Sequence, residues 1–163
     1  MKTFATPIVS SDGMFYYGRL KNLIIPAVDG EMGVLPGHEE MIIALKEGII
    51  RYQDAKEEWH KAAIGQGAIQ FANNRCTIVV DTAERPEDID INRALDAKRR
   101  AEEKLHQKLS EKEYRLLQSS LARALTRLKL MNQDRGLKGT LSLRTYRSIS
   151  VWKEGTLSGS PLM

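Results

Sequence analysis

The distribution of glycine divides this chain into parts that cannot share one kind of secondary structure. Eight of the 12 glycines lie within residues 1–83, and none lies between residues 83 and 135. Glycines at strand ends supply turns and bulges, whereas a long stretch without glycine favours helix. The sequence therefore predicts an α+β protein in which the β part and the α part occupy separate domains.

Residues 1–83 contain short apolar runs separated by turn signals about every 8–12 residues. A turn is predicted at residues 10–13, after the first strand, and a tight turn is predicted at Asn73 and Asn74. The remaining strands are predicted at residues 14–19, 23–28, 42–45, 49–52, 59–64, 68–71 and 76–80. Many short antiparallel strands indicate a sandwich or a barrel rather than a fold of alternating strands and helices.

A helical pattern begins after Pro86. Asp88 is the predicted N-cap of a first helix over residues 89–108, because its carboxylate can accept hydrogen bonds from free N–H groups. The apolar stripe of this helix is rich in alanine, which permits close approach of a partner helix. The stripe consists of Ala94, Ala97, Ala101, Leu105 and Leu109.

A second helix is predicted to restart at Ser110, which with Glu113 forms a capping-box pattern. Its apolar residues recur at spacings of three and four, as in a two-helix seam. They are Tyr114, Leu117, Leu121, Ala124, Leu128 and Met131. Because the break between the helices is short, we expect an antiparallel hairpin.

The domain organisation follows from these changes of pattern. We expect a β-sandwich docking domain at residues 1–85, a helical hairpin at 86–133 and a disordered tail at 134–163. Residues 1–83 carry 8 basic and 10 acidic side chains, whereas residues 84–135 carry 13 and 10 and residues 136–163 carry 4 and 1. The positive charge therefore belongs to the C-terminal half and is compatible with an anionic partner, although charge alone favours a solvated helix face.

Several classes of protein are excluded by what the sequence lacks. It has no apolar run long enough to span a membrane and no apolar signal-peptide core. The lone Cys76 fits a reducing compartment and a place in the core of a strand. His38, His60 and His106 show no metal-ligand spacing, and no phosphate-binding glycine motif is present. We therefore expect neither catalytic residues nor a metal site.

Four arginines of the predicted hairpin share a pattern that suits an anion. Arg93 and Arg100 lie on one face of the first helix, and Arg123 and Arg127 lie on one face of the second. Guanidinium groups brought together repel one another unless an anion binds among them, and they match phosphate oxygens. Glu84 and Asp90 lie near the start of the first helix, where they can accept hydrogen bonds from a base or a ribose. The alternative is that the arginines are solvated and pair with Asp96, Glu102 and Glu103.

The segment at residues 29–40 combines turn glycines, acidic residues and apolar residues. We expect a recognition loop on a rigid scaffold, and the alternative is a long hairpin connection.

Several motifs of this chain occur in the same order and at the same spacing as in one known protein family. Residues 29–38 resemble the docking-loop signature of the epsilon subunits of bacterial F-type ATP synthases. Residues 81–84 and 89–94 resemble the domain junction of that family and its IDxxRA motif, and residues 121–128 resemble its second helix. The resemblance covers about residues 3–131, and the tail after Met131 matches nothing in the family.

The resemblance implies a fold and a role. The fold is a ten-stranded β-sandwich followed by the hairpin. The sandwich would dock on the gamma subunit and the c-subunit ring, with Glu31 and His38 facing these partners. The chain would be a non-catalytic rotor-stalk subunit of a proton-translocating enzyme, peripheral at the cytoplasmic face of the bacterial plasma membrane. The extended hairpin would reach the alpha/beta catalytic hexamer and oppose ATP hydrolysis.

Some members of the family bind ATP in the folded hairpin, without an obligatory metal. The positions that match this regulatory site are Glu84, Ile89, Asp90, Arg93, Ala94, Arg100, Arg123 and Arg127. ATP bound there would hold the hairpin folded. Two alternatives remain at this point: a stand-alone nucleotide- or nucleic-acid-binding module that uses the basic hairpin, and an adaptor with a vestigial hairpin. The acidic β half and the lack of interleaved aromatic residues disfavour nucleic acid as a partner.

Overall fold

The computed structural model of the chain describes residues 2–135. The chain divides into two compact units, Met1–Asp88 and Ile89–Met163, which are described separately below. Of the tail predicted at residues 134–163, residues 134 and 135 belong to helix α2 (Glu111–Arg135), and residues 136–163 lie outside the described residues.

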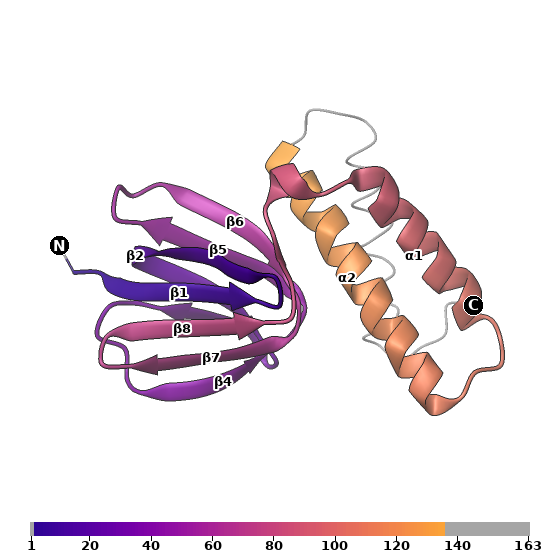
Figure 1. The fold of residues 1–163 in the computed structure, drawn as a ribbon, viewed down its shortest axis with the longest axis horizontal. Coiled ribbons are helices and arrows are strands. Elements are labelled where there is room, and N and C mark those ends of the chain that lie inside the picture. The colour runs from indigo at the N-terminus through magenta and orange to yellow at the C-terminus, as the bar shows by residue number, and fades with distance from the viewer. Residues whose placement is uncertain (1, 136–163) are drawn as a thin grey trace. The chain divides into compact units, whose positions relative to one another are not determined.

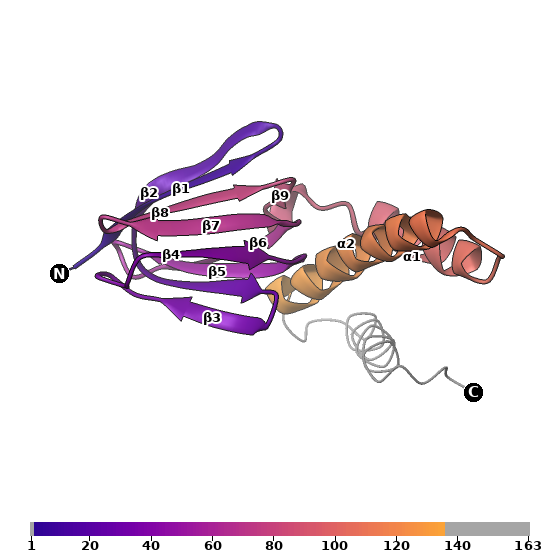
Figure 2. The same cartoon turned by 90° about the horizontal axis from the view of Figure 1, so that it is seen from below.

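The first unit consists of strands and one short 3-10 turn, η1 (Pro86–Asp88) (Figures 1 and 2). Its nine described strands are β1 (Phe4–Ser10), β2 (Gly13–Ala27), β3 (Gly30–Val34), β4 (Met41–Leu45), β5 (Gly48–Asp54), β6 (Trp59–Ile64), β7 (Gly67–Ala72), β8 (Arg75–Val80) and β9 (Ala83–Glu84).

The long strand β2 belongs to both layers of the sandwich. Its first half pairs antiparallel with β1, and its second half pairs antiparallel with β3 and β5. One layer continues from β1 through β8 and β7 to β4, and the other continues from β5 through β6 to β9. The side chains between the layers form one apolar core, with Phe4, Ile50 and Phe71 among its largest fully buried members.

Two expectations about the strands are wrong. The strands predicted at residues 14–19 and 23–28 are halves of β2, and β3 and β9 were not among the strands predicted from local sequence. The described residues contain nine strands, whereas the family resemblance implied ten. A register shift between Leu20 and Asn22 marks the place where the two predicted strands join into one. In addition, β1 pairs with β8 in parallel, whereas all the other strand pairs of the described residues are antiparallel.

The turns predicted from local sequence are confirmed. Gly13 follows the first turn with a φ of 120°, a conformation that favours glycine. Asn73 and Asn74 join β7 to β8 with φ values of 52° and 55°. These are the positive values that a two-residue hairpin turn requires and that asparagine tolerates.

Cys76 is a core residue of β8, as predicted, and its side chain is fully buried. Burial raises the pKa of the thiol from 9.0 to about 12. We expect the native thiol to resist an aromatic disulfide reagent at pH 8 and to react at once in denaturant, because the thiolate is the reacting species. Rapid and complete reaction of the native protein would contradict this placement.

The same shift sets the sign of a pH effect. The folded state retains the Cys76 proton between pH 9 and about 12, whereas the unfolded state loses it. The contribution of this group to stability is therefore complete below pH 9 and declines as the pH rises through that window.

The second unit is a hairpin of α1 (Ile91–Leu105) and α2 (Glu111–Arg135). Asp90, and not Asp88, is the N-cap of α1: its carboxylate accepts hydrogen bonds from the N–H groups of Asn92 and Arg93, at 3.0 and 3.2 Å. Asp88 is the last residue of η1, so α1 begins at Ile91 and not at residue 89. At the start of α2, Ser110 Oγ accepts from the N–H of Glu113 at 3.2 Å, which confirms the predicted restart.

The two helices pack through a seam of leucine against alanine. Leu121, Leu125 and Leu128 of α2 are buried against Ala94 and Ala101 of α1. Small residues on α1 let the helices approach closely, as the alanine stripe predicted. The predicted seam was wrong at its first residue, because Tyr114 is exposed, and it missed Leu125, which is buried.

Candidate functional site

Part of the segment predicted as a docking loop is a strand. Residues 30–34 form β3, which pairs with the second half of β2. Val34 is fully buried and Met32 packs against the core, while Glu31 and Gly33 face solvent. This alternation is a strand pattern that the two glycines obscured. The remaining loop lies between Val34 and Met41.

The two predicted docking residues lie at the surface of the sandwich, each held by a neighbour. Glu31 forms an ion pair with Arg51 of β5, with 2.6 Å between the carboxylate and the guanidinium group. The His38 ring packs edge-on against Phe71, with 5.6 Å between the ring centroids. The position of His38 therefore depends on the core beneath it.

One outer face of the sandwich carries a row of apolar side chains that the sequence reading missed. The row crosses β2, β1, β8, β7 and β4 through residues paired in the ladder: Met14, Val9, Val79, Ala68 and Ala44. We call it the apolar row. Met14 and Val79 keep 61% and 53% of their surface exposed, and Ile42 beside the row keeps 76%. A contiguous exposed apolar surface on a rigid sheet marks an interaction site.

The residues predicted for an ATP site fall on both units. Glu84 lies in β9, opposite Ala63 of β6, and belongs to the first unit. The other seven belong to the second unit. Of these, Asp90 uses a carboxylate oxygen for the N-cap, and Ala94 lies in the seam.

The four arginines differ in how they are held. Arg93 and Arg100 are exposed on α1, whereas Arg123 and Arg127 are half-buried on α2. The guanidinium group of Arg123 donates hydrogen bonds to the hydroxyls of Ser119 and Ser120, at 2.9 and 3.1 Å. This fixes a planar donor group in one orientation, which lowers the entropy lost when an anion binds.

Two of the acidic residues named as alternative partners of these arginines are engaged with other cations. Asp96 pairs with Arg99 at 3.3 Å, and Glu102 lies 3.3 Å from the ammonium group of Lys98. Both pairs lie within α1, while the exposed positions of Arg93 and Arg100 agree with the solvated alternative.

Within residues 2–135, no helix combines the length and the apolar character needed to cross a lipid bilayer.

Comparison with known families places both parts of the chain. Residues 3–86 match the beta-sandwich domain of the ATP synthase delta/epsilon chain, and residues 87–132 match the long alpha-helix domain of the same chain. Among solved structures, a chain of the Euglena gracilis mitochondrial ATP synthase has the same fold. That match has a TM-score of 0.66 at 22% identity and covers 75% of this chain and 77% of that one.

Curated relatives agree over nearly their whole length. The ATP synthase epsilon chain of Ruminiclostridium cellulolyticum is 41% identical over 135 residues, which are 83% of this chain and 100% of the relative. The epsilon chain of Caldicellulosiruptor bescii is 36% identical over 136 residues, 83% of this chain and 98% of the relative. The chain therefore belongs to the family of ATP synthase epsilon chains, which are non-catalytic stalk subunits of the F-type ATP synthase.

Proposed function

We propose that this stalk subunit couples the catalytic head to the c-subunit ring by docking its sandwich on the gamma subunit and on the ring. The apolar row carries the proposal, because an exposed apolar surface of this kind is stabilised when a partner covers it. The expected place of action is the cytoplasmic face of the bacterial plasma membrane.

We assign the two partners to different parts of the sandwich. The gamma subunit covers the apolar row, where burial of Val79 and Ile42 supplies a hydrophobic contribution to binding. The c-ring contacts the region of Glu31 and His38, whose polar groups suit the charged rim of an interface. The ion pair with Arg51 holds the Glu31 side chain in place, and the contact with Phe71 holds the His38 ring.

The hairpin has a regulatory role in this proposal. ATP bound at the arginines favours the folded hairpin, because a ligand that binds one state stabilises that state. When ATP is lost, the hairpin extends toward the alpha/beta hexamer and opposes ATP hydrolysis. The guanidinium groups neutralise the phosphates, so no metal ion is obligatory.

Substitution of Val79 by aspartate tests the docking surface. A carboxylate at the centre of the apolar row leaves an unpaired charge in the interface, so gamma-subunit affinity should fall at least about thirtyfold, as expected at an interface hot spot. Purified gamma subunit is titrated onto the full-length chain by calorimetry. The matched control is Lys56→Asp, which places the same carboxylate in the exposed β5–β6 turn. If the Val79→Asp protein binds the gamma subunit as tightly as the parent does, the apolar row is not the gamma-binding surface.

A further inference from the structure

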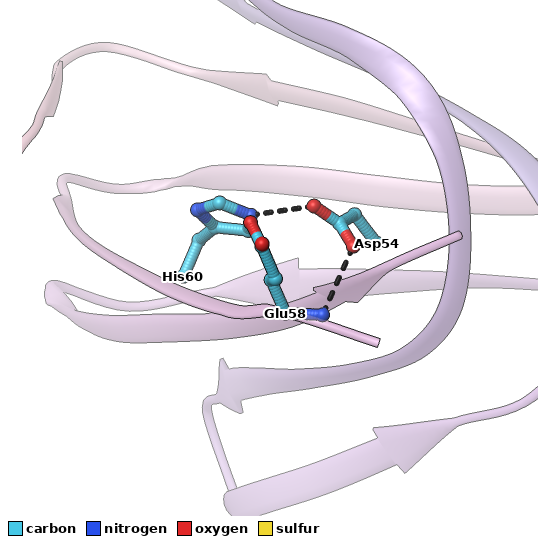
Figure 3. A group of neighbouring side chains, drawn as sticks. All are labelled: Asp54, Glu58 and His60. Atoms are coloured by element: carbon cyan, nitrogen blue, oxygen red, sulfur yellow. Dashed lines mark hydrogen bonds and ion pairs between the residues drawn. The ribbon is translucent and has the colours of Figure 1, made fainter. Parts of the chain in front are cut away.

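The hairpin of β5 and β6 brings together three side chains of metal-ligating types. One ligand atom each of Asp54, Glu58 and His60 lies within 4.8 Å of the others (Figure 3). In the ladder His60 is opposite Tyr52 and Trp59 is opposite Gln53, and the Asp54 N–H donates to the Glu58 carbonyl at 3.0 Å. Because side chains alternate along a strand, this register directs all three to one face.

The Asp54 carboxylate is fixed before any ligand arrives. Its Oδ1 accepts hydrogen bonds from the N–H groups of Lys56 and Glu58, at 2.9 and 3.0 Å. Its Oδ2 lies 2.8 Å from Nε2 of His60. These contacts, led by the His60 hydrogen bond, lower the pKa of Asp54, so the carboxylate is ionised at neutral pH. Only 20% of its side chain is exposed.

The His60 ring is also held in place. It stacks on Tyr52, with 5.2 Å between the centroids and 24° between the planes. Tyr52 in turn packs against Tyr16 at 4.9 Å. The stack aims Nε2 at Asp54, so the histidine loses little rotational freedom when it becomes a ligand.

Glu58 supplies a mobile third group. It follows Glu57, whose φ of 69° completes the turn. Its side chain is exposed, and Figure 3 shows its carboxylate beside the His60 ring. Two fixed groups and one adjustable group can close around an ion with side-chain movement alone.

We propose that Asp54, Glu58 and His60 form a binding site for a divalent transition-metal ion of the zinc type. One imidazole and two carboxylates are ligands that Zn²⁺ accepts at about 2.0–2.2 Å, with water in the fourth position. An imidazole disfavours Mg²⁺ and Ca²⁺, which take oxygen ligands, and the absence of a thiolate among the three disfavours Cu⁺. The ion takes the place of the hydrogen bond between Asp54 and His60, and two carboxylates balance its charge. The bound ion cross-links β5 to β6.

The spacings between the three histidines of the chain do not reveal this site. The three ligands lie within seven residues of chain, as D-x-x-x-E-x-H, and only the hairpin register shows that they share a face.

Calorimetric titration of zinc chloride into the full-length chain tests the site, with a chelator-stripped protein that carries no histidine tag. We expect one equivalent to bind. In a Trp152→Phe background we expect binding to change the fluorescence of Trp59, since Trp59 lies between two of the ligands in the sequence. Asp54→Asn and His60→Gln should each weaken binding at least about tenfold, since even supporting residues of metal sites have effects of that size. Glu58→Gln should weaken it less, and Mg²⁺ should not compete.

The controls separate this site from incidental binding to surface histidines. His38→Gln and His106→Gln should leave the affinity for zinc unchanged. The Asp54→Asn variant retains an oxygen that accepts hydrogen bonds from the turn N–H groups, and circular dichroism checks that it folds. If it does not fold, the zinc affinities of His60→Gln and Glu58→Gln test the site. A dissociation constant weaker than about 1 mM, or a His60→Gln protein that binds like the parent, would overturn the proposal and leave an ion pair that only fixes the turn.

Discussion

The Phe71→Ala variant is expected to lose about 3–5 kcal/mol of the free energy of unfolding of the sandwich, because it removes a large side chain from a closed core. Phe71 is 1% exposed and packs edge-on against Phe4, with 5.7 Å between the centroids. The cavity left behind is lined by strands of both layers, which cannot collapse into it without breaking ladder hydrogen bonds. His38 also loses its support, so docking should weaken together with stability.

Urea unfolding followed by fluorescence, in a Trp152→Phe background in which Trp59 is the one remaining tryptophan of the sequence, measures this loss. Gln70→Ala is the matched control, since Gln70 precedes Phe71 on the same strand and faces solvent. We expect the control to change stability by less than about 0.5 kcal/mol. A Phe71→Ala loss below about 1 kcal/mol would mean that the core is packed differently from the structure.

The second large effect concerns the hairpin. Arg93→Ala and Arg123→Ala should each lower ATP affinity at least about tenfold, since a hydrogen bond to a charged group contributes about 1.5–3 kcal/mol. For Arg123 the two serine hydroxyls hold the guanidinium group in place, so its removal also takes away a preorganised donor. Calorimetry with ATP on the full-length chain provides the affinities.

Two other arginines of the same helices serve as controls. Arg99 on α1 pairs with Asp96, and Arg115 on α2 pairs with Glu111. Substitution of either by alanine removes one positive charge without touching the assigned positions, so ATP affinity should stay within about twofold, the scale of surface electrostatics. If Arg93→Ala and Arg123→Ala bind ATP like these controls, the assigned nucleotide site is wrong.

Local sequence determined much of the fold. The Asn73–Asn74 turn, the turn before Gly13 and the Ser110 cap follow from conformational preferences of a few neighbouring residues, and the structure confirms each. The division into a β part and a helical part follows from glycine content and from period. These features depend on short stretches of chain, so no knowledge of distant contacts is needed to predict them.

Tertiary structure decided what depends on residues far apart in the chain. The parallel pairing of β1 with β8, the sharing of β2 between two layers and the apolar row each join segments that local patterns cannot relate. The same holds for β3, whose strand pattern is visible only when Met32 and Val34 are seen to face the core. The convergence of Asp54, Glu58 and His60 follows from one register of one hairpin, and a shift of one residue would direct them to opposite faces. Composition and period therefore established the β part, the two helices and most of the strands, and long-range pairing established which side chains meet.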